Sequence, residues 1–300
     1  MADADKLRAL TEPLRVAPGS RVALARDFDP RHLPDGLSKD EGKELLAECV
    51  EQLADLQARL SAQDTYGLLV VLQGIDGAGK DSTVRHVFSG LNPADVRVWS
   101  FKVPSVEELD HDFLWRYVQR LPERGKVGIF NRSHYEEVLV VRVHPENLVR
   151  EKLPAAAKRE GVWRRRYREI NDWEHYLVDN GFAVVKLFLN LSQEEQRQRF
   201  LRRIELPDHN WKFSSADVAE RRYWDDYQRA FSEMLLHTST EWAPWWVIPA
   251  DRKWFARLAV ASVVARTLLD IDPHYPTPDE AEQQALLAAR AQLEAEAATD

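Results

Sequence analysis

The stretch of sequence that decides the fold is residues 66–82, which read YGLLVVLQGIDGAGKDS. Its first half, 66–72, is a continuous apolar run, as expected of a strand buried on both faces of a parallel sheet. Its second half is a glycine-rich turn that ends in Lys80 at the start of a helix. Such a turn brings backbone N–H groups onto phosphate oxygens, and the helix N-terminus and the lysine add positive charge. The stretch therefore predicts a phosphate-binding loop whose binding residues are Gly77, Ala78, Gly79, Lys80, Asp81 and Ser82.

Two acids make this loop unusual. A Ser or Thr commonly follows the lysine and touches Mg²⁺, whereas Asp81 stands there in this chain and Ser82 comes next. Asp76 lies inside the loop, where its charge repels phosphates unless a cation or a proton accompanies it. We interpret Asp76 as the main catalytic carboxylate, held beside Mg²⁺, which orients the acceptor phosphate and assists its deprotonation. The alternative is a turn acid bonded to nearby backbone N–H groups.

Periodic segments around the loop predict an α/β protein. Besides 66–72, strands are expected over 96–101, 127–131, 182–190 and 245–249. Helices are expected over 40–60, 107–120, 162–180, 193–204, 216–237 and 253–269. Strands that alternate with helices predict a parallel sheet with right-handed crossovers. We expect one domain over 39–272, with an N-terminal arm over 1–38 and an acidic tail over 273–300.

Polar residues follow the third expected strand. Because the carboxyl ends of neighbouring parallel strands face one crevice, Asn131 and Arg132 are expected near the phosphate-binding loop. Arg132 can bind phosphate oxygens as a fork and stabilise the transferring group, with a structural ion pair as the alternative. Glu136 and Glu137 are candidate Mg²⁺ ligands or acceptor contacts, or else plain acids at a helix start. His134 we interpret as a packed or capping histidine.

A basic helix leads into a polar loop over residues 199–213, which read RFLRRIELPDHNWKF. Arg199, Arg202 and Arg203 fall at i, i+3 and i+4 of a helix. This pattern is typical of a lid, here about 199–217, that closes over phosphates and excludes water. Trp211 can stack on a base, although an aromatic plug under the loop is favoured. Over 151–222, fifteen Lys and Arg face twelve Asp and Glu. This balance fits either a polyanion track, with arginines of the 162–180 helix as candidates, or ion-paired helix faces.

Composition excludes several classes of protein. A net charge of −8 argues against a general nucleic-acid binder, whose affinity needs a basic surface. The single cysteine, Cys49, cannot form an intramolecular disulfide, and the N-terminus lacks the apolar run of a secretory signal. The apolar runs fall short of the about 18 residues that a membrane span needs. We expect a cytoplasmic protein with neither nucleic-acid nor membrane partners.

Four segments together resemble the type 2 polyphosphate kinase family: Gly74 to Ser82, Asn131 to Glu137, Trp211 to Phe213, and Thr238 to Trp245. The resemblance spans about 40–272. It implies a three-layer, thymidylate-kinase-like P-loop fold with a central parallel sheet and a helical lid. It also implies reversible phosphoryl transfer from inorganic polyphosphate to AMP or ADP, with Mg²⁺, or Mn²⁺ in its place. ATP and guanine nucleotides are further expected partners, and a homo-oligomer is the expected assembly.

The resemblance also assigns roles to residues. By it, Asp76 matches the essential loop acid, Lys80 the loop lysine and Arg132 the arginine of the second phosphate-binding motif. The implied lid cations are Arg199, Arg203 and Lys212, and Asp217 matches a further functional acid.

The third-strand motif departs from the family pattern. Many members read Asp-Arg-Ser-Trp-Tyr-Asn, whereas residues 131–136 here read NRSHYE. The change removes one expected Mg²⁺ ligand at the strand end, and Glu136 restores a negative charge nearby. The variant resembles the subgroup that accepts AMP as well as ADP.

Two alternatives to a polyphosphate kinase stay open from the residues. The first is an ATP-dependent nucleotide monophosphate kinase, because the fold does not fix the phosphate donor. The second is a non-catalytic P-loop protein that binds nucleotide without turnover. For an enzyme, we expect in-line transfer in which positioning and electrostatics provide most of the catalysis.

Overall fold

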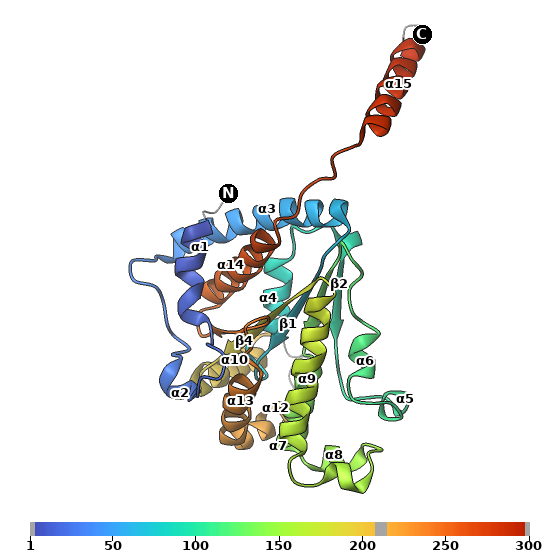
Figure 1. The fold of residues 1–300 in the computed structure, drawn as a ribbon. Coiled ribbons are helices and arrows are strands. Elements are labelled where there is room, and N and C mark those ends of the chain that lie inside the picture. The colour runs from blue at the N-terminus through green and yellow to red at the C-terminus, as the bar shows by residue number, and fades with distance from the viewer. Residues whose placement is uncertain (1–3, 208–214, 298–300) are drawn as a thin grey trace.

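The structure is a computed structural model that describes residues 4–207 and 215–297. Its centre is a five-stranded sheet in the order β2-β3-β1-β4-β5, with every neighbouring pair parallel (Figure 1). The strands are β1 (Gly67–Gln73), β2 (Val96–Ser100), β3 (Val127–Asn131), β4 (Phe182–Asn190) and β5 (Trp245–Pro249). The predicted parallel α/β sheet is confirmed, and the expected bounds of β3, β4 and β5 match the observed ones.

Helices cover both faces of the sheet and make three layers. Leu68 and Val70 of β1 pack with α3 (Lys39–Gln63) and α14 (Lys253–Ile271) in one core. Leu69 and Val71, which point the other way, pack with α9 (Val162–Asp179) and α13 (Trp224–Thr238) in a second core. Successive side chains of a strand face opposite sides of its sheet. This alternation explains why β1 reads as a continuous apolar run.

The other helices and helical turns complete the described part of the chain. They are α1 (Ala4–Thr11), η1 (Glu12–Leu14), α2 (Leu24–Asp27), α4 (Lys80–Val87), η2 (Pro93–Asp95), α5 (Val106–Leu109), α6 (Trp115–Val118), η3 (His134–Val138), α7 (Val140–Val143), α8 (Glu146–Arg150), η4 (Ala155–Lys158), α10 (Gln193–Glu205), α12 (Ser215–Glu220), η5 (Arg221–Tyr223) and α15 (Glu280–Ala297). None of the helices in the described ranges is long and apolar enough to span a bilayer.

Two expected helices are broken. The helix predicted over 107–120 is wrong, because α5 and α6 are separate single turns. Between them the carboxylate of Asp112 accepts from the N–H of Leu114, at 2.9 Å, which competes with helical hydrogen bonding. The helix predicted over 216–237 is interrupted by η5. There the Arg221 guanidinium donates to Gln193 and Gln196 of α10 rather than lying along its own helix.

The two ends of the chain differ in how they meet the body. Leu7 and Leu14 of the N-terminal segment are buried in the α3–α14 core. The N–H of Val16 donates to Trp245 O, and the backbone of Arg15 forms an isolated antiparallel β-bridge with Trp246. This segment therefore covers the edge of the sheet at β5. In contrast, α15 extends away from the body (Figure 1).

Candidate active site

The phosphate-binding loop joins β1 to α4. Gly77 and Gly79 have φ of 86° and 101°, in the left-handed region that favours glycine. Gly79 stands directly before α4, and Lys80 is the first residue of that helix. The loop therefore turns its chain sharply and delivers a helix N-terminus to the edge of the sheet, as the sequence predicts.

Side chains of α10 hold this loop by its carbonyl groups. Gln196 Nε2 donates to Asp76 O at 2.8 Å. Arg199 Nη1 donates to Gly77 O and Ala78 O, both at 2.9 Å. With these oxygens tied to α10, the opposite side of the loop is left to its N–H groups.

Arg199 differs from the expected lid cation. It is 5 % exposed, its Nη2 donates to the carbonyls of Ala250 and Asp251, and its Nε donates to Glu195. Together with the two loop carbonyls, these bonds use all five N–H groups of the guanidinium. Arg199 therefore braces the loop from behind, and it has no N–H left for a phosphate in this structure.

We expect Arg199→Lys to destabilise the protein without any ligand present. An ammonium has three donors in place of a planar fork, so several hydrogen bonds to charged groups or loop carbonyls are lost, at about 2–4 kcal/mol of unfolding free energy. Chemical denaturation of the apo protein measures this loss. Arg202→Lys, an exposed neighbour on α10, is the matched control. If Arg199→Lys kept the wild-type free energy of unfolding but bound polyphosphate more weakly, Arg199 would be a lid cation after all.

Other predicted loop residues also have partners. The N–H of Ala78 donates to Ile75 O, so it faces inward rather than towards a phosphate. Lys80 Nζ lies 2.5 Å from Gly74 O, and burial lowers the pKa of its ammonium while Asp76 opposes that change. Asp81 accepts from Asn131 Nδ2 at 2.5 Å.

This bond explains how an acid is accommodated after the lysine. Asn131 and Asp81 join β3 to α4 at the loop. Both residues therefore lie at the predicted site, but the Asn131 amide and the Asp81 carboxylate hydrogen-bond to each other. Ser82 Oγ accepts from Arg257 of α14 at 2.9 Å. No motif in the sequence points to Arg257 as that partner.

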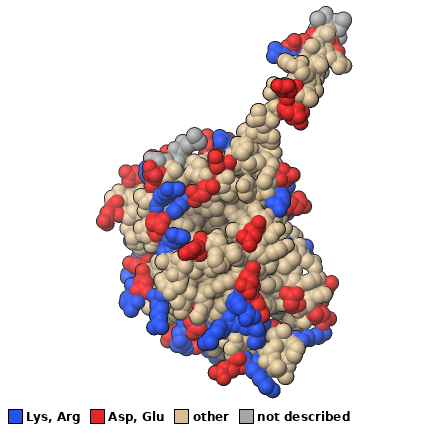
Figure 2. Space-filling view, viewed as in Figure 1, with Lys and Arg blue, Asp and Glu red and all other residues tan. Residues whose placement is uncertain are grey.

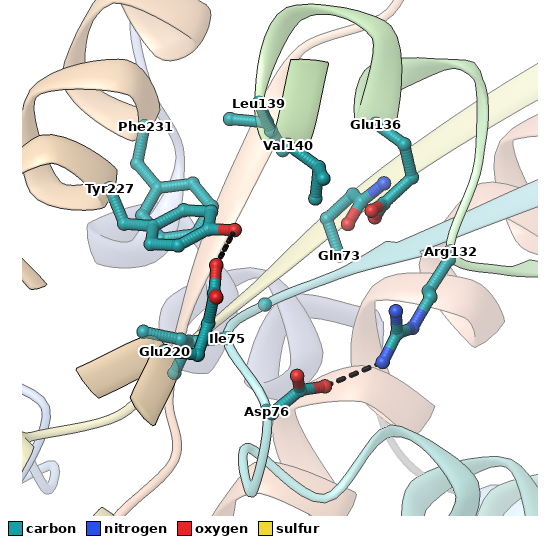
Figure 3. A pocket seen from close by; sticks show the side chains of 11 residues that line it. Gln73, Ile75, Asp76, Arg132, Glu136, Leu139, Val140, Glu220, Tyr227 and Phe231 are labelled. Carbon is teal, nitrogen blue, oxygen red and sulfur yellow. Dashed lines mark hydrogen bonds and ion pairs between the residues drawn. The ribbon is translucent and has the colours of Figure 1, made fainter. Parts of the chain in front are cut away.

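Asp76 and Arg132 form an ion pair at the centre of the site, with Arg132 Nη2 2.5 Å from Asp76 Oδ1 (Figure 3). Burial opposes the charge of Arg132, but Asp76 and Glu136 outweigh it and raise the pKa of the guanidinium. The pair confirms that the third-strand motif meets the loop. It lines a small cavity of about 40 Å³ together with Gln73, Glu136 and Tyr227.

A second, larger cavity of about 540 Å³ also has Arg132 in its wall. Arg132 and Glu136 line both spaces. Apolar side chains and cations contribute to the wall of the larger one, among them Val103, Phe113, Leu153, Lys102, Arg150 and Lys152. Its volume lies in the range that small-molecule sites occupy, about 300–1,000 Å³.

The two candidate metal-binding glutamates are placed differently. Burial raises the pKa of Glu136, although Arg132 and Lys80 oppose the rise, and its carboxylate faces the loop. Glu137 lines the larger cavity and not the small one beside the loop. Its carboxylate accepts from Tyr117 OH at 3.3 Å and lies 3.6 Å from Arg166, and burial raises its pKa to about 7. The structure therefore disfavours Glu137 as a ligand of a metal beside Asp76.

The remaining carboxylates fit a metal shared with phosphates better than a preformed protein site. The described residues contain no group of three or more His, Cys, Asp or Glu that could hold an ion by themselves. However, burial and the nearby charge of Asp76 raise the pKa of Asp217, and Asp76 also raises that of Glu136. Mg²⁺ commonly binds one or two carboxylates, substrate phosphates and water. Asp76 with Glu136 or Asp217 provides that donor set.

The expected lid and polyanion track are only partly within the described residues. Lys212 and Trp211 lie outside them. Arg203 of α10 lies 3.6 Å from Asp217 of α12, so it is engaged with the predicted functional acid. On α9, Arg165 and Arg168 pair with acids four residues on, and Figure 2 shows basic and acidic side chains intermingled on the face it draws. For Arg165 and Arg168, these contacts fit the ion-paired alternative.

Some site residues carried no usable signal in the sequence. Gln73, the last residue of β1, donates to Ser133 Oγ at 3.1 Å and lines the small cavity. Tyr227 also lines it and donates to Glu220 Oε1 at 2.6 Å (Figure 3). Gln196 lies three residues before Arg199 and on the same face of α10. This helical spacing is the one sequence feature that could have identified Gln196 as a site residue.

Comparisons with known proteins agree with one another. A family model described as Polyphosphate kinase 2 matches residues 36–275. The chain is 47% identical over 288 residues to an ADP-polyphosphate phosphotransferase of Rhodopseudomonas palustris, which covers 96% of this chain and 99% of that one. It is 44% identical over 278 residues to an AMP/ADP-polyphosphate phosphotransferase of Meiothermus ruber, covering 91% and 98%.

A solved structure supports the same assignment. The crystal structure of polyphosphate kinase 2 from Arthrobacter aurescens TC1 superposes with a TM-score of 0.83 at 41% identity, covering 93% of this chain and 96% of that one. The sequence and the fold of this chain are thus similar to those of enzymes of one kind. The chain belongs to the polyphosphate kinase 2 family, and it is a phosphotransferase that uses polyphosphate and nucleotides.

Proposed function

We propose that this enzyme transfers phosphoryl groups from inorganic polyphosphate to both AMP and ADP, and that it works reversibly with Mg²⁺. The observation that carries the proposal is that Arg132 and Glu136 line two spaces at once. One space adjoins the phosphate-binding loop, and the other is large enough for a nucleotide. Two phosphorylated ligands placed there would meet at the Asp76–Arg132 pair.

We assign the donor to the loop and the acceptor to the larger cavity. The loop offers backbone N–H groups, a helix N-terminus and Lys80, which suit a chain of phosphates without an organic part. The larger cavity adds apolar walls such as Val103 and Phe113, against which a base and ribose can pack. Mn²⁺ in place of Mg²⁺, and guanine nucleotides as acceptors, belong to the same proposal.

In the proposed mechanism this chain binds and orients the reactants. Lys80 and the loop amides hold the terminal phosphoryl group of the donor. Arg132 stabilises the charge on the group as it moves, and Asp76 orients the acceptor phosphate and takes up its proton when it carries one. Family members generally depend on a divalent metal, which neutralises phosphate charge when bound. Asp76, with Glu136 or Asp217, would hold it.

The decisive experiment omits ATP. Purified protein is incubated with Mg²⁺, long-chain polyphosphate and either AMP or ADP, and products are separated by ion exchange. We expect ADP from AMP and ATP from ADP. Absence of product with polyphosphate, together with ADP formation from AMP and ATP, would favour the ATP-dependent kinase instead. Nucleotide binding without either reaction would favour a non-catalytic protein.

The donor chain also needs a path away from the loop, and three cations beside α4 provide one. Arg85 lies on α4, and Lys253 and Arg257 lie on the first turns of α14. Partial burial and the neighbouring Arg199 and Arg202 lower the pKa of Lys253, and partial burial and Arg85 lower that of Arg257. Within the described ranges, none of these three cations forms an ion pair, whereas Arg165 and Arg168 of α9 do.

We expect Arg85→Gln/Lys253→Gln to weaken use of long polyphosphate selectively. Each lost phosphate contact weakens binding of a polyanion and reduces its salt dependence, so KM for long chains should rise about tenfold. KM for tripolyphosphate, which ends near the loop, should stay within about twofold of wild type. Arg165→Gln/Arg168→Gln on α9 is the matched control. An equal rise for both chain lengths, or a rise in the α9 variant alone, would refute this path.

A further inference from the structure

Beneath the site lies a group of polar side chains sealed from solvent. His134 and Tyr135 of η3, Glu174 of α9 and Lys186 of β4 are each 0 % exposed. Glu174 Oε1 accepts from Tyr135 OH at 2.8 Å and from His134 Nε2 at 3.1 Å. Lys186 Nζ donates to Glu174 Oε2 at 2.7 Å, to Tyr135 OH at 3.0 Å and to Thr238 O at 2.5 Å. We name these four residues the buried network.

The charges in the buried network follow from its contacts. Burial opposes ionisation of Glu174, but Lys186 and His134 outweigh it and lower the pKa of the carboxyl. Burial lowers the pKa of His134, although Glu174 opposes that change. Because an ionised carboxylate can only accept hydrogen bonds, the His134 Nε2–H is the donor to Glu174. An ammonium and a carboxylate then neutralise each other inside the protein.

Stability alone is a poor account of such a network. Removing an ion from water costs several kcal/mol even after relaxation, and well-packed apolar residues often serve a core equally well or better. Unlike apolar contacts, hydrogen bonds are directional, so each charged or hydroxyl group of the network fixes the position of the group to which it bonds. In this protein the buried network fixes one segment of the chain.

That segment is the turn after β3. Arg132 has a φ of 63°, in the left-handed region, which is costly for a residue other than glycine and persists where surrounding contacts determine it. On the β1 side, the N–H of Arg132 donates to Leu72 O at 3.1 Å and Gln73 Nε2 donates to Ser133 Oγ at 3.1 Å. On the far side, His134 and Tyr135, which follow Ser133, hydrogen-bond to Glu174, and Tyr135 also accepts from Lys186.

We infer that Glu174 and Lys186, acting through His134 and Tyr135, are positioning residues that hold Arg132 and Glu136 in the geometry for phosphoryl transfer. The inference rests on the proposed roles of Arg132 and Glu136. Glu136 directly follows Tyr135 in η3, so one anchor serves both active-site residues. Glu174 and Lys186 are fully buried and line neither cavity, so neither is placed to contact a substrate there.

The test removes the hydrogen bonds that anchor η3 to Glu174 and leaves the Glu174–Lys186 ion pair in place. His134→Phe/Tyr135→Phe keeps two aromatic rings but removes both hydrogen bonds from η3 to Glu174. We expect kcat to fall at least about tenfold, because small misplacements of a catalytic group are costly in the transition state. KM values for ADP and polyphosphate should change by less than about threefold. If the double variant does not fold, Tyr135→Phe alone should show the same split with a smaller fall in kcat.

The matched control is Tyr167→Phe. Tyr167 is a buried tyrosine of α9 whose hydroxyl accepts from Arg142 at 2.8 Å, away from the turn. It should lose thermal stability to a similar extent and keep the wild-type kcat. If the anchor variant also kept the wild-type kcat, the buried network would be structural and the inference would be wrong.

A double-mutant cycle separates positioning from general damage. In an Arg132→Ala background the guanidinium is absent, so the anchor substitutions should lower kcat by clearly less than they do in wild type. The same fall in both backgrounds would overturn a role through Arg132. Failure of the proposed function is distinguishable from both results, because it would appear as inactivity of the wild-type enzyme with polyphosphate and ADP.

Discussion

Asp76→Asn is expected to lower kcat with polyphosphate and ADP by about 10²–10³-fold, the size of effect that follows loss of one key electrostatic contact in a transition state. Asn keeps the shape of the side chain but removes the charge that balances Arg132 at 2.5 Å. It also removes a proton acceptor and one oxygen donor for the divalent metal. Steady-state kinetics of ATP formation measures the change.

Binding should survive this substitution. The loop carbonyls remain tied to Gln196 and Arg199, and Lys80 and the loop amides are unchanged, so affinity for polyphosphate should stay within a few-fold of wild type. Asp172→Asn, at an exposed acid on α9, is the matched control and should keep full activity. Wild-type turnover by Asp76→Asn would remove Asp76 from the mechanism.

Arg132→Lys should lower kcat by a comparable factor, about 10²-fold. Lysine keeps the positive charge but replaces a planar fork of donors by a compact ammonium, and it cannot bridge Asp76 and a phosphate in the same way. Because Arg132 lines both cavities, its loss affects the point at which donor and acceptor meet. Rates of ATP formation from ADP, and of the reverse reaction, should fall together.

The control for this substitution is Arg168→Lys, which changes an exposed, ion-paired arginine of α9. It should leave both directions unaffected. If Arg132→Lys raised only the KM for nucleotide and kept kcat, Arg132 would be an acceptor-binding residue without a role in the transferring step.

Local signals in the sequence predicted the loop and the strand ends. A glycine-rich turn between a buried strand and a helix depends on residues that are neighbours in the chain, so its geometry is encoded within residues 66–82. The proximity of Arg132 to Asp76 followed from a general property of parallel sheets, whose strand ends share one edge. The lid over 199–217 stays a prediction, since 208–214 lie outside the described residues.

Interpretations that depended on partners far along the chain were less successful. Arg199 was assigned to a lid because it belongs to a set of arginines at helical spacing. That spacing does not show which side of the helix packs against the phosphate-binding loop. Glu137 was a candidate metal ligand until the structure placed it against Tyr117 and Arg166. For the 107–120 segment, side-chain hydrogen bonding by Asp112 outweighed helical periodicity.

By itself, the sequence predicted the order of the five strands along the chain, the phosphate-binding loop, and the proximity of Asp76 to Arg132. The tertiary structure alone decided that Arg199 braces the loop, that Arg132 and Glu136 face two cavities, and that Glu174 and Lys186 stand behind the Arg132 turn. The physical reason is the range of each interaction. Hydrogen bonds along a turn or a helix are written into adjacent residues, whereas a contact such as that between His134 and Glu174, 40 residues apart, exists only after α9 packs on the sheet.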